Sequence, residues 1–266
     1  MTTYTVVVED GNTRWCDSTT TLLHRVDGPA VEYASGYKEW YQNGRLHREG
    51  GPAIEQKDGT TEWYQNGKKH REDGPAIQYS YGNAEWFIDG LRHREDGPAI
   101  EWADGTKIWY KHGLRHRDDG PALEWGNGGK EWYINGKWHR DDGPAVARAN
   151  GDIEFRIHGM LHRANGPAVV RSNGTKAWWV NGLRHREDGP AGLYADGSVQ
   201  WYKHGELHRE DGPAVEYPND LKKWYLDGVE LSEEEHLQRT KGDGLLLVTS
   251  VVDFIKSIFL PKWRLE

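Results

Sequence analysis

Residues 62–84 read EWYQNGKKHREDGPAIQYSYGNA, and this 23-residue pattern repeats along almost the whole chain. Its histidine returns at a constant step, at His24, His47, His70, His93, His116, His139, His162, His185 and His208. An aromatic residue, a turn glycine and the proline of Gly-Pro-Ala keep the same step, with no insertion or deletion between units. Such a fixed period predicts a repeat protein in which each unit contacts only its neighbours.

The composition indicates how this chain buries apolar surface. Hydrophobic residues make up only 36% of it and the mean hydropathy is -0.90, yet there are 14 Trp and 13 Tyr. Large flat side chains bury much area per residue, so we expect a core built on aromatics. A single cysteine, Cys16, excludes an intramolecular disulfide and fits a reducing compartment. Without a recognisable signal peptide, the chain is expected to be cytoplasmic.

Turn dipeptides favour strands over helices within each unit. Asn66-Gly67 is typical of a β-hairpin, and similar dipeptides recur too often for helices to fit between them. We therefore expect two strands per unit, which in the second unit span about 61–65 and 75–79, joined by a connection over about 66–73.

Alternation along these strands predicts which side chains share a face. A two-residue turn at positions 58–59 would place Trp63 opposite Ile54 and Glu55 opposite Glu62. Tryptophan and aliphatic side chains would then occupy one face, and glutamate and tyrosine the other. Like charges directly opposite are unfavourable, so a bulged turn that shifts the pairing is the alternative.

The predicted fold class is all-β, an elongated antiparallel sheet of nine tandem 23-residue β-hairpin repeats with a C-terminal helical cap. Two strands per unit, at about 4.8 Å per strand, would advance the array by roughly 10 Å per repeat. Strand twist predicts that so large a sheet is curled.

The two ends depart from the pattern, as the ends of a repeat array should. Residues 1–23 predict a capping hairpin, 24–228 the repeat array, and 229–266 a helical cap or tail. Within the last segment, 232–235 form a capping box that predicts a short helix. Residues 245–260 predict a second, mostly apolar helix, which is short for a membrane span. We expect it to cover the last strands; a partner-binding or membrane-surface helix is the alternative.

The pattern resembles MORN repeats, which have a similar length, an aromatic first strand, an Asn-Gly turn and a second strand ending in Asp-Gly. Residues 62–70, EWYQNGKKH, match the first part of that motif, and 77–79 belong to the second. Residues 71–76, REDGPA, replace the Gly-x-Gly between them. The resemblance covers about 24–228 and implies an open β-sheet array that binds partners without catalysis. The variant motif is also similar to repeat proteins of phages and large viruses.

The histidines in register do not predict metal sites. Neighbouring histidines would lie about 10 Å apart, whereas zinc needs ligand nitrogens about 2.0–2.1 Å from the metal. We expect instead that the arginine and aspartate of a motif, such as Arg71 and Asp73, form an ion pair. The imidazole is expected to hydrogen-bond the backbone or to stack on a tryptophan edge. We therefore predict no metal and no cofactor.

Function, if it is localised, is expected where the columns break. The sixth unit departs most, and around it lie the candidate binding residues Arg148, Arg156, Arg163 and Arg171. In a chain of net charge -8 this basic spot could take a phosphate, a carboxylate or an acidic partner; drift in a tolerant unit is the alternative. On the two-residue register Arg156 faces away from Arg148 and Arg171. Trp138 and Trp179 also break their columns and are candidate exposed contacts for a partner.

No phosphate-binding loop, nucleophile motif or zinc motif occurs in the sequence, so we expect no enzyme. The acidic net charge disfavours nucleic-acid binding. The leading hypothesis is a scaffold that presents an aromatic and acidic surface to a protein partner, with self-association through open sheet edges possible. The alternatives are a sponge for a small phosphorylated ligand, and an inhibitor that imitates nucleic acid to occupy a host protein.

Overall fold

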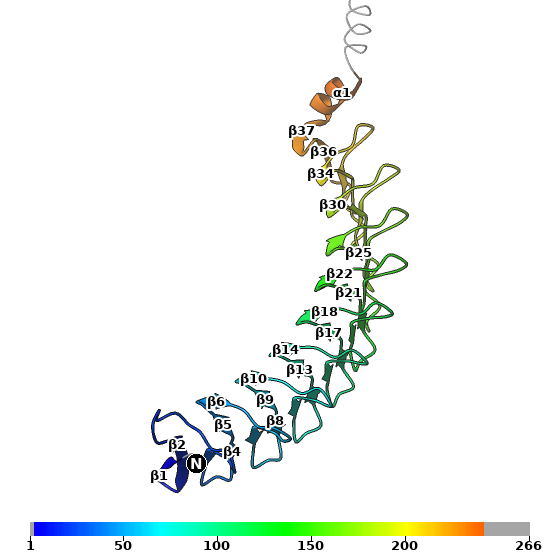
Figure 1. Cartoon of the computed structure of the whole chain (residues 1–266). Helices are drawn as coiled ribbons and strands as arrows, with labels where there is room; N and C mark the ends of the chain where they lie inside the picture. Colours follow the sequence, from blue (N-terminus) through cyan, green and yellow to red (C-terminus); the bar gives the residue numbers. More distant parts are fainter. Residues whose placement is uncertain (1–2, 242–266) are drawn as a thin grey trace, which may run out of the picture. The chain divides into compact units, whose positions relative to one another are not determined.

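The computed structural model describes residues 3–241, and the fold is all-β apart from one helix, α1 (Glu233–Lys241) (Figure 1). Within these residues the chain forms two compact units: 3–150 with Ile157–Gly159, and Gly151–Arg156 with 160–241. Tandem β-hairpin repeats build both units, which confirms the predicted fold class at the level of the repeat.

Each repeat contains four short strand pieces, where the sequence predicted two strands. In the second repeat they are β8 (Thr61–Glu62), β9 (Tyr64–Gln65), β10 (Lys68–Lys69) and β11 (Ile77–Gln78). The predicted connection over 66–73 was wrong in part, because β10 lies inside it. β9 and β10 pair across Asn66-Gly67 as a separate hairpin, while β8 and β11 belong to the main ladder of strands.

The main ladder of the first unit is antiparallel, and each strand pairs with the next in the order β1 (Tyr4–Glu9), β2 (Asn12–Asp17), β3 (Val31–Glu32), β4 (Lys38–Glu39), β7 (Ile54–Glu55), β8, β11, β12 (Ala84–Glu85), β15 (Ile100–Glu101), β16 (Lys107–Ile108), β19 (Leu123–Glu124), β20 (Lys130–Glu131), β23 (Val146–Ala147). The second unit repeats this arrangement with β24 (Ile153–Glu154), β27 (Val169–Val170), β28 (Lys176–Ala177), β31 (Gly192–Leu193), β32 (Val199–Gln200), β35 (Val215–Glu216), β36 (Lys222–Leu226) and β37 (Val229–Leu231).

The Asn-Gly hairpins project beside the ladder (Figure 1). Asn66 and Gly67 both have positive φ, at 52° and 83°, as a two-residue type I′ turn requires. The other hairpin strands are β5 (Tyr41–Gln42), β6 (Arg45–Leu46), β13 (Phe87–Ile88), β14 (Leu91–Arg92), β17 (Tyr110–Lys111), β18 (Leu114–Arg115), β21 (Tyr133–Ile134), β22 (Lys137–Trp138), β25 (Arg156–Ile157), β26 (Met160–Leu161), β29 (Trp179–Val180), β30 (Leu183–Arg184), β33 (Tyr202–Lys203) and β34 (Glu206–Leu207).

The second turn of each repeat has three residues, so the register predicted from a two-residue turn was wrong and the bulged alternative is confirmed. The amide of Gln56 donates to the carbonyl of Thr60, and Gly59 takes a φ of 91°. Ile54 therefore lies opposite Glu62, and Glu55 opposite Thr61. This shift relieves the repulsion between the two glutamates.

A shift of one residue exchanges the two faces of the ladder. The aliphatic column consists of Ile77 and its equivalents in the other repeats, and the glutamate column of Glu62 and its equivalents. The two columns share a face, because directly paired residues point the same way and Ile77 pairs with Glu62 on one side and Glu85 on the other. Tyr64, two positions after Glu62, is on that face as well. The predicted division, with tryptophan and aliphatic side chains against glutamate and tyrosine, was therefore wrong.

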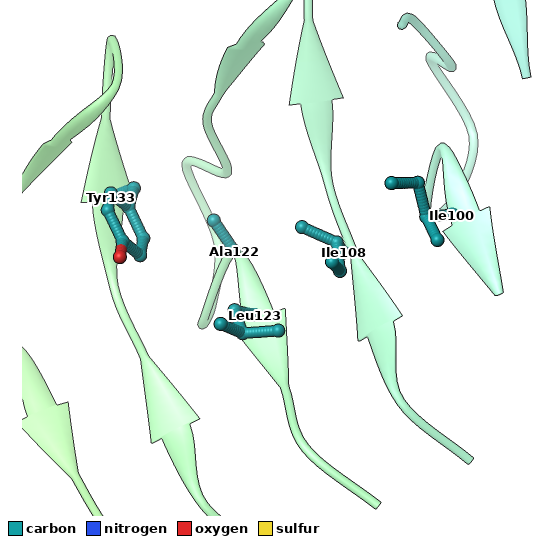
Figure 2. Close-up of a cluster of buried hydrophobic side chains, with 5 residues drawn as sticks. All are labelled: Ile100, Ile108, Ala122, Leu123 and Tyr133. Atoms are coloured by element: carbon teal, nitrogen blue, oxygen red, sulfur yellow. The ribbon is translucent and has the colours of Figure 1, made fainter. Parts of the chain in front are cut away.

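The aliphatic column forms the core, together with the alanine of Gly-Pro-Ala. In the first unit Ile100 and Ile108 are 3% exposed, Leu123 is fully buried, and Ala122 and Tyr133 pack with them on neighbouring strands (Figure 2). Burial of an Ile or Leu side chain stabilises a fold by about 1.5–3 kcal/mol, and every repeat contributes such a position except where Gly192 replaces it.

An arginine holds each loop of the His-Arg-x-Asp-Gly-Pro-Ala motif against the ladder. The guanidinium of Arg71 lies 4.0 Å from the ring centre of Trp63, Nε donates to Asp73 Oδ1 at 2.9 Å, and Nη1 donates to the carbonyl of Pro75 at 3.3 Å. The predicted pairing of arginine with aspartate is thus confirmed. The same stacking, at 3.8–4.3 Å, joins Arg25 to Trp15, Arg48 to Trp40, Arg94 to Trp86, Arg117 to Trp109, Arg140 to Trp132, Arg163 to Phe155, Arg186 to Trp178 and Arg209 to Trp201.

The histidine of each motif joins one repeat to the next. Nδ1 of His47 accepts a hydrogen bond of 3.1 Å from the amide of Asn66, which starts the turn of the following hairpin. We call this contact the histidine clamp, and it recurs from His24 to His208 at 3.0–3.2 Å. The expectation that the imidazole hydrogen-bonds the backbone is confirmed.

The ends of the array are built as follows. β1 and β2 form the expected N-terminal hairpin, and Trp15 takes the tryptophan position although it is two residues out of step. The expected capping box is confirmed, because Ser232 and Glu235 hydrogen-bond each other at the start of α1. His236, 2% exposed, hydrogen-bonds the carbonyl of Arg209 at 2.6 Å and so fixes α1 on the last repeat. The helix expected over 245–260 lies outside the described residues.

The glycine of Gly-Pro-Ala leaves room for the arginine, and this predicts the effect of a methyl group there. A Cβ on Gly97 would lie 3.0 Å from Cζ of Arg94. We expect Gly97→Ala to lower the free energy of unfolding by about 1–3 kcal/mol, because the guanidinium must leave the ring of Trp86. Urea unfolding followed by tryptophan fluorescence measures this loss.

The matched control is the same substitution in an Arg94→Ala background. There the methyl group meets no guanidinium, so Gly97→Ala should cost less than in the wild type, and the two substitutions should not be additive. Equal costs in both backgrounds would show that the arginine is not the reason for the glycine.

Candidate interaction surfaces

Grooves with acidic walls lie between consecutive His-Arg-x-Asp-Gly-Pro loops. One groove, of about 510 Å³, lies between the loops that begin at His93 and His116, and Trp109 with the stacked guanidinium of Arg117 forms part of its lining. We call these the acidic grooves. Three more of about 710, 440 and 770 Å³ lie between 71–75 and 93–96, between 117–120 and 139–142, and between 185–190 and 208–211.

Six of the nine loops carry two carboxylates with different surroundings, as the loop that begins at His93 shows. Arg94 donates to Asp96 at 3.0 Å, and this hydrogen bond lowers the pKa of Asp96. Glu95, whose side chain is 84% exposed, has its Oε1 3.4 Å from Nε2 of His93. Because Nδ1 of His93 accepts in the histidine clamp, the neutral ring carries its proton on Nε2 and can donate it to Glu95. One guanidinium against two carboxylates leaves each such loop with one net negative charge.

Three of the histidine clamps contain a second histidine. His112, His158 and His204 supply the clamped amide, and their rings stack on those of His93, His139 and His185 with centres 4.4–4.6 Å apart. These pairs stabilise the turn to which they belong. Within residues 3–241 no group of three or more His, Cys, Asp or Glu side chains is arranged to hold a metal ion.

The candidate arginines lie in different surroundings. Arg156 and Arg171 converge on Glu154, with Arg156 Nε 2.8 Å from Oε2 and Arg171 Nη2 2.7 Å from Oε1. The expectation that Arg156 faces away from Arg171 was wrong, because it rested on the two-residue register. Arg163 stacks on Phe155 and donates to the carbonyl of Pro167, as its counterparts in other repeats do.

Arg148 differs from the other three candidates because it is exposed. It lies two positions after Val146, at the end of β23 in the first unit, and no side chain or backbone group among residues 3–241 hydrogen-bonds or ion-pairs with it. In the described part of the chain its guanidinium is therefore open to an external anion.

Burial and hydrogen bonds act against each other at Glu154. This residue is 5% exposed, so burial alone would raise its pKa, but the hydrogen bonds from Arg156 and Arg171 outweigh burial and lower the pKa. A phosphate bound by these two arginines would have to displace a carboxylate that they already hold. In other repeats the glutamate of this column is held by tyrosine instead, as Glu62 is by the hydroxyl of Tyr64.

The two candidate tryptophans are half-buried, so the expectation that they are exposed was wrong. Trp138 packs against Tyr133 with ring centres 5.4 Å apart, and its Nε1 donates to Glu131 at 2.9 Å. Trp179 has no such acceptor, because the glutamate column has Ala177 there, and its Nε1 is buried without a hydrogen bond. Both rings belong to the aliphatic face rather than to an open surface.

Two surfaces of the molecule were not predicted from the sequence. The acidic grooves could have been inferred from the Glu-Asp or Asp-Asp pair that precedes six of the nine Gly-Pro-Ala triplets. The second surface contains Trp102 and Trp125, 38% and 39% exposed, at a position that is tyrosine in four other repeats. Their exposure follows from the register of the three-residue turn, which the sequence left open.

Comparison of the sequence with protein-family models and with curated proteins gave no match. Within residues 3–241 the structure has no helix of sufficient length and apolarity to cross a membrane.

The arginine pair around Glu154 gives a pH-dependent prediction. A carboxyl whose folded-state pKa is lowered stabilises the fold above its unfolded-state pKa of about 4.3, and this contribution is lost as the pH falls through the folded value. We expect Glu154→Gln to lower the free energy of unfolding by about 1–3 kcal/mol at pH 7. The difference from wild type should shrink steadily as the pH falls below about 4.

Urea unfolding of both proteins at several pH values between neutral and acid measures this difference. Taking the difference removes the contribution of the loop aspartates, which both proteins share. A gap that stays constant down to the acid limit would contradict the assignment.

Proposed function

We propose that this chain is a non-catalytic repeat scaffold that binds a basic protein partner along its acidic grooves. The observation that carries the proposal is the recurrence of one groove with the same acidic walls in successive repeats. A catalytic centre is a unique arrangement of groups, whereas a surface that repeats suits a partner with repeated contacts. The MORN-like pattern supports the same class, and its variant motif supports a viral source.

Charge supports a basic partner. The net charge is -8, and each of the six loops with two carboxylates contributes one net negative charge. At about 10 Å per repeat this density is far below that of duplex DNA, with one charge per about 1.7 Å. The comparison favours an ordinary basic protein segment over the nucleic-acid-mimicking alternative. A single cysteine supports a cytoplasmic location.

The phosphorylated-ligand alternative has less support. Arg156 and Arg171 are neutralised by Glu154 and by Asp152, which lies 3.5 Å from Arg171. Only the exposed Arg148 keeps an open guanidinium among the four candidate arginines, and one exposed arginine does not form a phosphate pocket.

A peptide with lysine at every third position tests the proposal. We expect it to bind the full chain with an affinity that falls as salt is added. Glu95→Lys with Asp118→Lys, which reverses charge in one acidic groove, should weaken binding severalfold, because opposite charges then become like charges. Fluorescence anisotropy of the labelled peptide measures both effects.

Glu234→Lys with Glu233→Lys is the matched control, since both residues are exposed on α1 and line none of the four acidic grooves. It makes the same change in net charge and should alter binding less. If the two double variants weaken the peptide equally, only net charge matters and the grooves are not the site.

A further inference from the structure

A row of aromatic side chains runs along the first unit, separate from the acidic grooves. Tyr79, Trp102 and Trp125 each lie two positions after the buried aliphatic residue of their repeat, so they share the face of Ile77, Ile100 and Leu123. We call them the aromatic row. Consecutive members are separated by two strands of the ladder, which is about 9.6 Å. None of the three lines an acidic groove described above.

The two tryptophan rings of the aromatic row are exposed, unlike those of Trp86 and Trp109, while Tyr79 is half-buried against Ile77. Trp102 and Trp125 are 38% and 39% exposed. By contrast, the rings of Trp86 and Trp109 are covered by the guanidinium groups of Arg94 and Arg117. At the first position of the row Tyr81, 63% exposed, packs against Tyr79 with ring centres 5.2 Å apart and extends the aromatic surface.

Hydrogen bonds fix the row in place at two of its positions. The hydroxyl of Tyr79 donates to Glu85 at 3.2 Å, and Nε1 of Trp125 donates to Glu131 at 3.2 Å. Trp125 also leans over Gly129, where a Cβ would come within 3.1 Å of its ring. Side chains that are already ordered lose little conformational entropy when a ligand binds.

Trp102 has no such acceptor. The glutamate column has Ile108 in this repeat, and no group among residues 3–241 accepts a hydrogen bond from the indole N–H of Trp102. The middle of the row therefore offers an aromatic face together with a free hydrogen-bond donor. A ligand that supplies a carbonyl oxygen would satisfy it.

The step of the row decides between peptide conformations. A polyproline II helix has three residues per turn and a rise of about 3.1 Å per residue, so its side chains recur on one side about every 9.3 Å. This spacing is close to the roughly 9.6 Å between members of the row, and the mismatch summed over three positions is less than about 1 Å. An extended strand places side chains on one face every 6.6–6.8 Å or so, and an α-helix repeats about every 5.4 Å, so both would fall out of step. Polyproline II also has no internal hydrogen bonds, which leaves its carbonyls free to accept.

The row ends at a positive charge. Arg148 occupies the next equivalent position after Trp125, is exposed, and has no partner within the described residues. In a chain of net charge -8, an arginine without a carboxylate at this position is suited to an acidic side chain of the ligand.

We propose that Tyr79, Trp102 and Trp125 form the docking surface for a proline-rich segment of a protein partner, bound as a polyproline II helix with an acidic residue beside Arg148. Aromatic ridges that hold such helices are a recurrent mode of peptide recognition, since the ligand is stiff before it binds. This surface is distinct from the acidic grooves, so the segment need not belong to the partner that occupies them.

The test uses the full chain and a labelled peptide of repeated Pro-Pro-Ala triplets ending in glutamate, followed by fluorescence anisotropy. We expect binding to the wild type, and a loss of at least tenfold in affinity for Trp102→Ala. Trp102→Phe keeps a ring without the N–H and should fall between the two. Tyr217→Ala, at the same position of a repeat in the second unit, is the matched control and should bind as the wild type does.

A second peptide that ends in glutamine tests the polarity of the site. It should bind the wild type more weakly than the glutamate peptide, and Arg148→Gln should make the two peptides equal. An alternating Thr-Val peptide of the same length should not bind.

Three results would overturn the proposal: no binding of the proline-rich peptide to the wild type, equal binding by folded Trp102→Ala and wild type, or equal binding of the Thr-Val peptide. Circular dichroism of each variant establishes that it is folded. The groove variant Glu95→Lys with Asp118→Lys should bind the proline-rich peptide like the wild type, so this proposal and the proposed scaffold function fail independently.

Discussion

The stacking of one arginine guanidinium on one aromatic ring determines the fold of the loop in each repeat and the residues that the loop can contain. Arg71 reaches Trp63 only if the loop folds back over the ladder, and it then has donors left for Asp73 and for the carbonyl of Pro75. The glycine before that proline is required because any Cβ would occupy the space of the guanidinium. Each stack contributes about 0.5–2 kcal/mol, and its repetition stabilises an array whose ladder strands are mostly two residues long.

Much of this fold could be predicted from the sequence, because the period and the turn dipeptides restrict it strongly. The hairpin at Asn66-Gly67, the arginine–aspartate pair and the capping box at Ser232 follow from local chemistry that one repeat contains. The register could not be settled in the same way, because a turn of two residues and one of three differ by a single position. This difference of one position decides which side chains share a face of the ladder. The expected orientation of Arg156, which rested on the two-residue turn, was therefore wrong.

The candidate sites show the same limit. A broken column was taken as the sign of a site, yet Arg156 and Arg171 replace aromatic residues and take over their task of holding a buried glutamate. Their substitution conserves a hydrogen-bonded carboxylate and does not open a pocket. The open positions arise where a partner is missing: Ile108 leaves Trp102 without an acceptor, and Arg148, which is exposed, has no hydrogen bond or ion pair with any residue in 3–241. Such absences become visible only when the neighbours across the strands are known.

The histidine clamp makes the repeat a unit that can be added or removed. Each clamp runs from one repeat to the turn of the next, and its hydrogen-bond donor is a backbone amide, which every residue type found at that turn supplies. Asparagine, aspartate and histidine therefore serve equally well at that turn, and any repeat can follow any other. Duplication or loss of whole repeats would leave every junction intact, so the length of this array can evolve by recombination in steps of one repeat without redesign of the fold.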